Sequence, residues 1–438
     1  MIERLDADYL IIGTGAMSMA FADVILAHDE SARIVMVDKR PAPGGHWTDA
    51  YPFVRLHQPA LFYGLHSTCL GSGGADLASG PEIVAYFDRA MQRFVATGRV
   101  RFLPMCEYRG EGQVVSLIDP EQSYEVTAHR RVVDGSYLEA SVPSMRPPAF
   151  DVASDVELCP PNRLPRIRSA HDEYVIVGAG KTGIDAVLFL LENAVPPDRI
   201  TWITPNDSWL WDRATVPAGG ALSTFRVMLE RVLKEQDPQA AFLQLERDGI
   251  VLRLDPRRLP TKWRCATIER SEAEQLRRVQ NVVRLGRVRK VHEGRVELDN
   301  GEIDIATDAL IVDCSANGLT SRPVRPIFAE GAVTLQSVLM CQQTFSAALL
   351  ARLELVSMSD TRRNALLKPV PHPEAAEDIA TTLPLSIRNM LSVTRVLPRW
   401  LRGSRLYLGH HEPLPTYVAE AARMGVALAR SRPVTAGA

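Results

Sequence analysis

The sequence predicts an α/β fold built around two parallel sheets, and three observations carry this prediction. The chain has 438 residues, which is long enough for two or three domains with full cores. Two glycine-rich turns, at residues 13–15 and 178–183, each follow a short apolar run. Each turn also precedes a helical pattern. A buried strand, a tight turn and a helix make up the repeating unit of a parallel α/β sheet, so we expect two doubly wound, Rossmann-like units.

Composition and charge narrow the function classes. The chain is 46% hydrophobic and 23% charged, and its net charge of −2 gives no reason to expect nucleic-acid binding. No run approaches about 20 consecutive apolar residues, and the N-terminus lacks the apolar core of a signal peptide. The six cysteines are scattered, without a CxxC pair. We therefore expect free thiols in a reducing cytoplasm, with no disulfide and no metal site.

The first glycine turn has the residues that a dinucleotide pyrophosphate requires. It follows the apolar run at residues 9–12, where Gly13 permits the tight turn and Gly15 lets the backbone approach the pyrophosphate. Ser18 takes the third small position, at which the helix packs closely on the strand. Because the free N–H groups at the start of such a helix face a pyrophosphate, this turn predicts a bound dinucleotide.

The next strand supplies a further contact with this dinucleotide. Residues 33–37 end at Asp38, where a carboxylate would bind the ribose hydroxyls, and Lys39 follows as a second polar candidate. The alternative is an α/β unit that binds no nucleotide.

The second glycine turn matches the full GxGxxG spacing. Its glycines are Gly178, Gly180 and Gly183, and Lys181 and Thr182 lie between them as further cofactor-binding candidates. Two such turns in one chain predict two dinucleotides. Hydride transfer from a nicotinamide to a flavin is the common chemical reason for that pair.

The strand after the second turn indicates which nicotinamide dinucleotide binds. Residues 199–203 end at Thr204 and not at an acid. A carboxylate there would bind the free 2′-hydroxyl of NAD and repel a 2′-phosphate, so its absence favours NADPH. Arg213 or Lys181 would pair with the phosphate, although Asp207 stands only three residues beyond Thr204.

The residues after Asp38 form a Gly-Gly-x-Trp motif, which consists of Gly44, Gly45, His46 and Trp47. Together with the first turn and the acid, this motif resembles the class B flavin monooxygenases, which have two dinucleotide domains. That group includes the flavin-containing monooxygenases, the N-hydroxylases and the Baeyer–Villiger monooxygenases. The resemblance implies FAD in the first unit, NADPH in the second, and Gly45 and Trp47 close to the flavin ring. Disulfide reductases share this layout, but they carry a redox cysteine pair after the turn, where this chain has only an unpaired cysteine.

The polar segment after the tryptophan resembles the Baeyer–Villiger stretch Tyr-Pro-Gly-x-Arg-x-Asp. Tyr51 and Arg55 align with that stretch, and His57 takes the place of its aspartate. The resemblance implies that Arg55, His57 and Gln58 are catalytic candidates at the reactive face of the flavin, as hydrogen-bond donors. The alternative is a structural loop. The Phe-x-Gly-x-x-x-His fingerprint of these families is absent at residues 150–156, so the subfamily stays unassigned.

The rest of the chain completes the two units. Residues 99–137 alternate in polarity and predict a small antiparallel sheet. Residues 214–280 predict a mostly helical insertion over the active-site cleft. A hairpin with a turn at Gly301 then precedes a strand at residues 307–315, which returns the chain to the first unit.

The C-terminal part is expected to close the flavin site. A helical pattern runs from Val333 to Leu355, with Gln336 near its start, and the resemblance implies that this helix points at the flavin pyrimidine. A basic amphipathic stretch at residues 383–408 is expected to pack on its own domain and not on a membrane. The expected domains, with the NADPH domain inserted into the FAD domain, are 1–145 for FAD (first part), 170–306 for NAD(P)H, and 307–438 for FAD (second part) with a helical C-terminus.

These features predict an FAD-dependent, NADPH-using oxidoreductase. We expect a cytoplasmic monooxygenase that transfers one oxygen from a flavin C4a adduct to a small organic substrate, with dioxygen as the co-substrate. One alternative is an NAD(P)H:acceptor flavin reductase or oxidase. Another is a flavin-binding protein whose second nucleotide unit is not catalytic. Association into a homodimer is left open.

Overall fold

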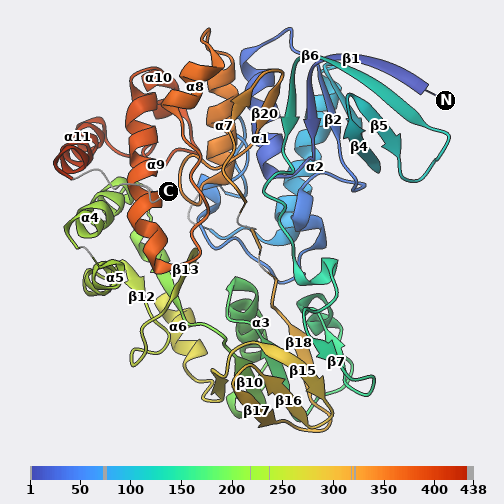
Figure 1. Cartoon of the computed structure of the whole chain (residues 1–438), viewed down its shortest axis with the longest axis vertical. Coiled ribbons are helices and arrows are strands. Elements are labelled where there is room, and N and C mark those ends of the chain that lie inside the picture. Colours follow the sequence, from blue (N-terminus) through green and yellow to red (C-terminus); the bar gives the residue numbers. More distant parts are fainter. Residues whose placement is uncertain are drawn as a thin grey trace.

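The computed structural model describes residues 2–72, 76–217, 219–235, 237–316, 318–319 and 322–431. Its larger sheet has the strand order β19-β20-β6-β1-β2-β3, and β4 and β5 join it through β6 (Figure 1). Strands β20, β6, β1, β2 and β3 are parallel, as the two sequence repeats predict. The strands are β1 (Ile2–Ile12), β2 (Ile34–Val37), β3 (Val100–Leu103), β4 (Cys106–Gly110), β5 (Gln113–Ser116), β6 (Ser123–Asp134), β19 (Phe328–Ala329) and β20 (Ala332–Thr334).

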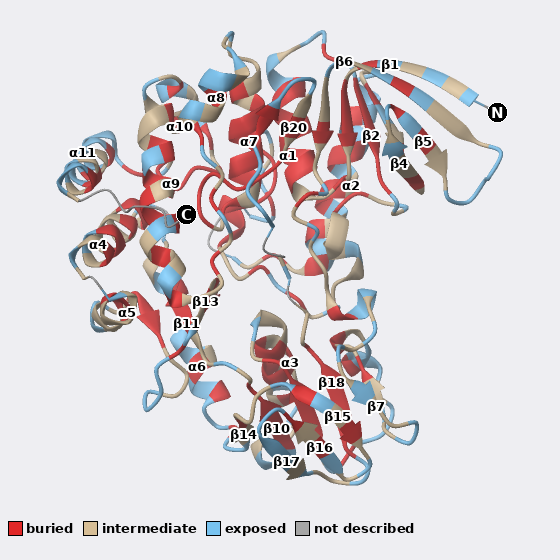
Figure 2. Cartoon of the chain, in the orientation of Figure 1, coloured by how far each residue is buried: buried red, intermediate tan, exposed pale blue. Residues whose placement is uncertain are grey.

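Three helices cover this sheet, and we call the sheet and these helices the first unit. They are α1 (Ala16–His28), α2 (Gly80–Ala96) and α7 (Gln343–Glu354). Every residue of α1 from Met17 to Leu26 is buried, because α1 packs both on the sheet and on the neighbouring α7 (Figure 2). A helix that is apolar on all sides needs such a central place.

The second glycine turn belongs to a smaller sheet of parallel strands, in the order β14-β10-β9-β18-β8. We call this sheet, with helices α3 and α6, the second unit. Its elements are β8 (Leu158–Cys159), β9 (Tyr174–Val177), α3 (Lys181–Glu192), β10 (Ile200–Ile203), α6 (Arg270–Leu276), β14 (Val282–Val283) and β18 (Leu310–Asp313). A four-stranded sheet packs beside it and contains β7 (Asp151–Val152), β15 (Val288–His292), β16 (Arg295–Leu298) and β17 (Gly301–Asp304). The predicted turn at Gly301 joins β16 to β17.

The helical pattern predicted at residues 214–280 is found in three helices, at residues 221–234, 238–247 and 270–276, but two strands also lie in the described part of this range. We call residues 208–268 the insertion. Their strands have the order β12-β11-β13. The elements are β11 (Ser208–Asp212), α4 (Ala221–Lys234), α5 (Pro238–Arg247), β12 (Val251–Leu252) and β13 (Lys262–Ile268). The strands form because large aromatic side chains, among them Trp209 and Trp263, are fully buried between the small sheet and the helices.

The C-terminal part is helical, as predicted, and it packs against the insertion. Its helices are α8 (Asp360–Leu366), α9 (Ile379–Thr394), α10 (Pro398–Gly403) and α11 (Leu414–Arg430). Helix α4 of the insertion contacts both α9 and α11, so that segments far apart in sequence form one helical layer (Figure 1). The expected end of the FAD domain at residue 438 lies outside the described residues. Among the described helices, none is long and apolar enough to cross a bilayer.

Two further sequence predictions need correction. Residues 99–137 do form an antiparallel run, β4-β5-β6, but β3 and β6 also pair in parallel with β2 and β1 of the main sheet. The expected helix from Val333 to Leu355 begins only at Gln343, because Val333 and Thr334 pair with β6 as part of β20. Gln336 therefore lies in the loop after a strand and not in a helix.

Candidate active site

Close packing around the first glycine turn fixes its backbone. Gly13 has φ +81°, which favours glycine. A Cβ atom added to Gly135 would lie 1.8 Å from Oγ of the buried Ser18, so helix α1 packs directly on the chain that leaves β6. Helix α1 begins after Gly15 with no side-chain cap and no acid in its first turn. Its first N–H groups therefore fit a phosphate.

Asp38 binds this turn itself. Its Oδ2 accepts hydrogen bonds from the Thr14 backbone N–H at 2.6 Å and from Thr14 Oγ1 at 2.7 Å. Its Oδ1 accepts from the backbone N–H of Arg40 at 2.9 Å, and the residue is 6% exposed. The neighbouring Lys39 points to solvent and pairs with Glu107 at 2.8 Å. Asp38 thus shapes the turn, and Lys39 lies on the surface.

The Gly-Gly-x-Trp motif lies against the first turn. The backbone N–H of Gly44 donates to the carbonyl of Thr14 at 2.9 Å. A Cβ atom on Gly45 would come within 3.0 Å of the Cα of Gly15, so the two backbones need glycine at their contact. Trp47 Nε1 donates to the Tyr63 hydroxyl at 2.8 Å. The motif is therefore a fixed wall beside the turn.

The second glycine turn has the same framework but opens outward. Gly178 has φ +119°, and a Cβ atom on Gly183 would lie 2.0 Å from the Gly178 carbonyl oxygen. Gly180, by contrast, has no atom within 4 Å of its Cβ position, and helix α3 begins after it without a side-chain cap. Thr182 stands in the first turn of that helix, beside Lys181, whose ammonium pairs with Asp185. This turn also fits a pyrophosphate.

A cavity of about 280 Å³ adjoins the second turn at Thr204. The Thr204 hydroxyl is buried and has no hydrogen-bond partner among the described residues. The carboxylate of Asp207, also in the cavity wall, is paired with Arg284 at 2.9 Å. Four arginines line the cavity, namely Arg253, Arg257, Arg277 and Arg284. Arg253 pairs with Glu246 and Arg257 pairs with Asp255, so an anion in this cavity would have to share these guanidinium groups with carboxylates.

Arg213, which the sequence offers as a partner for the 2′-phosphate, lies elsewhere. Its guanidinium forms ion pairs with Glu269 at 2.8 Å and with Glu272 at 3.0 Å. Its Nε donates to the His57 carbonyl at 3.2 Å, and the side chain is only 7% exposed. Two carboxylates already neutralise this charge, so Arg213 joins the insertion and α6 to the polar segment.

The three catalytic candidates of the polar segment differ in exposure and in hydrogen-bond partners. Arg55 is exposed, and its Nη1 donates to the Leu77 carbonyl at 3.2 Å. The Nδ1 atom of His57 is buried and has no partner among the described residues. Burial, together with the positive charges of Lys181 and Arg213, lowers the pKa of His57 to about 3. His57 is therefore a neutral imidazole at physiological pH.

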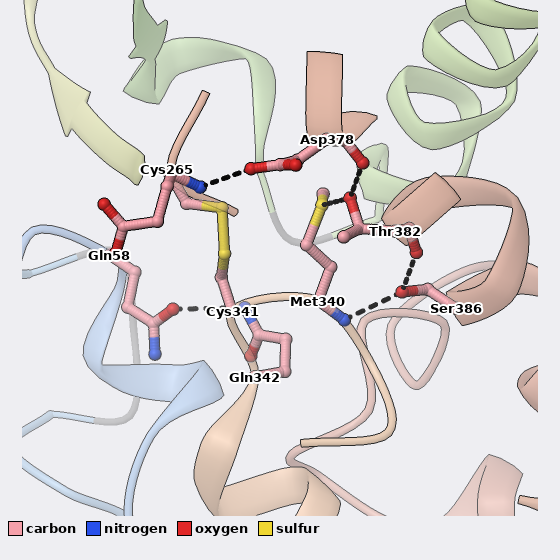
Figure 3. Close-up of a disulfide and its surroundings, with 9 residues drawn as sticks. Gln58, Cys265, Met340, Cys341, Gln342, Asp378, Thr382 and Ser386 are labelled. Carbon is pink, nitrogen blue, oxygen red and sulfur yellow. Dashed lines mark hydrogen bonds between the residues drawn. A yellow bond between two sulfur atoms is a disulfide. The ribbon is translucent and has the colours of Figure 1, made fainter. Parts of the chain in front are cut away.

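Gln58 belongs to a cluster that the sequence does not reveal (Figure 3). Its Oε1 accepts a hydrogen bond at 3.1 Å from Nε2 of Gln342, which is 9% exposed. The preceding residue, Cys341, forms a disulfide with Cys265 on β13. The expectation of free thiols is thus wrong for these two cysteines. Their separation of 76 residues leaves no local spacing signal.

Two more side chains connect the segments around the site. The side-chain amide of Gln336 already has a partner within the protein, since its Nε2 donates to the Arg325 carbonyl at 3.0 Å. The Tyr51 hydroxyl donates to Asp185 of helix α3 at 2.6 Å. Burial and the Asp185 carboxylate raise the pKa of Tyr51 well above its ordinary value. Tyr51 therefore links the two units as a neutral donor.

Solved structures of monooxygenases share this fold. Cyclohexanone monooxygenase bound to ε-caprolactone matches with a TM-score of 0.54 and 15% identity, over 97% of this chain and 99% of that chain. Steroid monooxygenase bound to NADP matches with a TM-score of 0.52 and 15% identity, over 80% and 83%. OTEMO in complex with FAD and NADP matches with a TM-score of 0.54 and 14% identity, over 82% and 85%. The resemblance to class B flavin monooxygenases is thus confirmed for the fold.

Sequence relatives define the family. No family model matches this chain. Uncharacterized proteins of Mycobacterium tuberculosis and of Mycobacterium bovis are 43% identical over 424 residues, which cover 93% of this chain and 78% of each relative. The chain therefore belongs to the family of these mycobacterial proteins, and its fold is that of the class B flavin monooxygenases.

Proposed function

We propose that the protein is an FAD-dependent, NADPH-using monooxygenase that transfers one oxygen atom of dioxygen to a small organic substrate. The observation that carries this proposal is the pair of glycine turns, each placed before a helix whose N-terminus has no side-chain cap. The solved structures with this fold include proteins bound to FAD and NADP. Two dinucleotides on one chain support hydride transfer from a nicotinamide to a flavin.

The first turn fits FAD as its ligand. Gly13 and Gly15 carry no side chain that would keep a pyrophosphate from their backbone, and Ser18 lets α1 pack closely. Gly45 and Trp47 would border the ring system beside this turn. Asp38 would reach the ribose only by sharing or exchanging its hydrogen bonds with Thr14. When bound, FAD accepts the hydride and activates dioxygen.

The second turn and its cavity fit NADPH. Gly178, Gly180 and Gly183 would admit the pyrophosphate, and the unpartnered hydroxyl of Thr204, which lines the adjoining cavity, would bind the ribose. We propose Arg257 as the partner of the 2′-phosphate in place of Arg213. The Arg257 side chain lines the cavity and pairs with Asp255 at 3.0 Å. This side chain is 87% exposed, unlike the buried Arg213, so its guanidinium can leave this carboxylate for a phosphate.

The polar segment contributes donors without adding charge. The neutral His57 can donate from one ring nitrogen, and its buried Nδ1 lacks a partner among the described residues. The Gln58 oxygen is occupied by Gln342, so its amide group remains as a donor. Donors that are fixed before the reaction stabilise charge that develops in it. We keep Arg55 outside this set, because it is exposed and bound to Leu77.

The test is to purify the protein, record its visible spectrum, and add NADPH first without and then with oxygen. The expected result is a yellow protein that NADPH bleaches and that then converts a sulfide, amine or ketone to an oxygenated product. Bleaching followed by stoichiometric hydrogen peroxide, with no product from any of the three substrate classes, would instead establish the reductase or oxidase. A yellow protein that NADPH never bleaches would establish the flavin-binding alternative.

Three organisational statements also remain proposals. We propose the domain order given by the sequence, with an NAD(P)H domain inserted into the FAD domain, and we extend the inserted domain beyond residues 170–306 to include β8 and β18 of its sheet. We propose a cytoplasmic location, supported by four free cysteines, namely Cys69, Cys106, Cys159 and Cys314. We propose a small-molecule substrate and dioxygen as partners, and size-exclusion chromatography with light scattering would decide between a monomer and a homodimer.

A further inference from the structure

The disulfide connects two segments that frame Gln58. Cys265 lies on β13 of the insertion, and Cys341 lies in the loop between β20 and α7 of the first unit (Figure 3). Both cysteines have positive φ values, +56° and +59°, which are uncommon for residues other than glycine. Such a backbone persists only where its surroundings hold it in place. The bond therefore joins two restrained segments across the candidate active site.

The loop that carries Cys341 is held on both sides of this residue. The backbone N–H of Met340 donates to Ser386 Oγ of helix α9 at 3.0 Å. On the other side, Gln342 stands at the start of α7, and its Nε2 donates to Gln58 Oε1 at 3.1 Å. The Gln342 backbone is also bound to Leu339 and Ser346. The disulfide is the covalent restraint in this set, and it acts on the residue directly before Gln342.

The Gln342 contact decides how the Gln58 amide is turned. Gln58 accepts through its oxygen, so its NH₂ group points away from Gln342 and remains a donor. The Oε1 atom of Gln342 is itself buried and has no partner among the described residues. A buried polar atom without a partner is costly, so this pair of amides is typical of a site that awaits a ligand.

We propose that the Cys265–Cys341 disulfide is a thiol-reducible clamp on Gln342, and that Gln342 is a positioning residue which holds the Gln58 amide as a donor in the candidate active site. The proposal of a donor role rests on the proposed function, whereas the clamp itself does not. Reduction requires an external dithiol. Its two electrons and two protons break the S–S bond and yield the Cys265 and Cys341 thiols, while the dithiol becomes a disulfide. Cys265 is 3% exposed and Cys341 is partly exposed, so the reductant would attack at Cys341.

Because this bond lies next to Gln342, its reduction would regulate the activity of the proposed enzyme. Disulfides that form in a reducing cytoplasm are usually transient and have a catalytic or redox-sensing role. Reduction would leave the loop attached at Met340 but free at Cys341. Gln342 could then leave Gln58, whose amide would turn freely. The chemical class of the signal is therefore a dithiol reductant, which would lower the coupling of NADPH oxidation to product.

The first experiment tests the clamp without any cofactor. Protein purified without reductant is denatured and its thiols are titrated, and the expected count is the four free cysteines. After treatment with dithiothreitol the count should rise to six, which is the total in the chain. Hydrogen exchange should then become faster at residues 335–342, and the Cys341→Ser variant should reproduce this change. A count of six before reduction, or exchange that reduction leaves unchanged, would overturn the clamp.

The second experiment tests the positioning role. In Gln342→Glu the carboxylate can only accept, so the Gln58 amide must turn its NH₂ group towards residue 342. We expect product formation per NADPH to fall about tenfold to a hundredfold, since misplacing a group in a reactive site by about 1 Å costs on the order of a hundredfold. Flavin reduction by NADPH and the KM for NADPH should not change. Gln342→Asn, which keeps the donor on a shorter arm, should recover part of the coupling.

The matched control is Cys69→Ser, which removes an exposed free thiol far from the clamp in sequence. It should keep the wild-type coupling and the wild-type response to dithiothreitol. Wild-type protein that binds no FAD would refute the proposed function but leave the thiol and exchange results readable. If the wild type couples NADPH to product equally well with and without dithiothreitol, and Gln342→Glu matches it, the positioning role is wrong.

Discussion

The two glycine turns share one framework but differ in what already fills them. In the first unit, Asp38 holds Thr14 through two hydrogen bonds, and Gly45 is packed on Gly15. In the second unit, the Cβ position of Gly180 faces open space, and the turn adjoins a cavity of about 280 Å³. The turn of the first unit must therefore exchange some of its own contacts when a ligand binds. The turn of the second unit can accept a ligand without such a rearrangement. We expect slow, tight binding of FAD at the first turn and rapid exchange of NADPH at the second.

The largest expected effect comes from closing the first turn. Gly15→Val places a branched side chain where the pyrophosphate must approach. We expect protein that folds but carries no flavin, as measured by the absorbance of the purified protein. Gly403→Ala, where the added Cβ meets no atom within 4 Å, is the control and should keep its flavin. Full flavin occupancy in Gly15→Val would show that FAD binds elsewhere.

Blocking the second turn should separate the two cofactors. Gly180→Val fills space that is open in this structure, so stability should change by less than about 1 kcal/mol. We expect the variant to retain FAD but to lose reduction by NADPH, as followed by anaerobic stopped-flow absorbance. Reduction at the wild-type rate would mean that the open turn is not the nicotinamide site.

The proposed donors His57 and Gln58 should affect oxygen transfer but not flavin reduction. Removing one donor in such a site costs on the order of 3 kcal/mol, or about a hundredfold in rate. We therefore expect His57→Ala and Gln58→Ala to release hydrogen peroxide in place of product, with unchanged flavin reduction. A hydrogen peroxide assay and product analysis measure these two outcomes, and stopped-flow absorbance measures flavin reduction. Wild-type coupling in both variants would make the segment a structural loop.

Choice between NADPH and NADH should depend on the open turn. Arg257 would give the 2′-phosphate a charge-assisted but solvent-exposed partner, so Arg257→Ala should raise the KM for NADPH, by up to about tenfold. The KM for NADH should stay the same. The neighbouring Arg258 does not line the cavity, so Arg258→Ala is the matched control. A parent enzyme that already prefers NADH would contradict the assignment, and Thr204→Glu should strengthen any such preference.

The effect that is smallest at neutral pH concerns the histidine between the turns. The folded-state pKa of His57 is about 3, whereas the unfolded value is about 6.5. The unfolded chain therefore binds the extra proton, and stability is full above pH 6.5 and falls as the pH drops towards 3. Urea unfolding at pH 7 and pH 5 should show that His57→Gln loses less stability than the wild type, by up to about 2 kcal/mol. The exposed His129→Gln variant should match the wild type.

Local chemistry explains which features the sequence could predict. The glycine turns, the strands beside them and the hairpin at Gly301 each depend on a few neighbouring residues with defined backbone needs. The placement of Ser18 against Gly135 follows from the same close packing. These predictions were confirmed because short-range sterics decide them.

The features that were missed depend on distant partners. Arg213 looked like a free cation, but its two carboxylates come from α6, and Asp38 looked free, but Thr14 occupies it. The disulfide and the Gln58–Gln342 pair join segments that only the folded chain brings together. A single sequence contains no local pattern for such pairs. Strands β12 and β13 of the insertion were missed because both pair with β11, which lies outside the segment predicted to be helical.

The shared hydrophobic core of the insertion has a consequence for biosynthesis. Trp209, Phe225 and Trp263 of the insertion belong to the same buried cluster as Tyr9 of β1 and Leu383 of α9, whereas the second sheet has cores of its own. During translation, the insertion leaves the ribosome long before α9 and α11 do. Its apolar face must then wait for the end of the chain. We expect nascent chains that stop before Ile379 to bind chaperones through the insertion, although the second sheet within them has already folded.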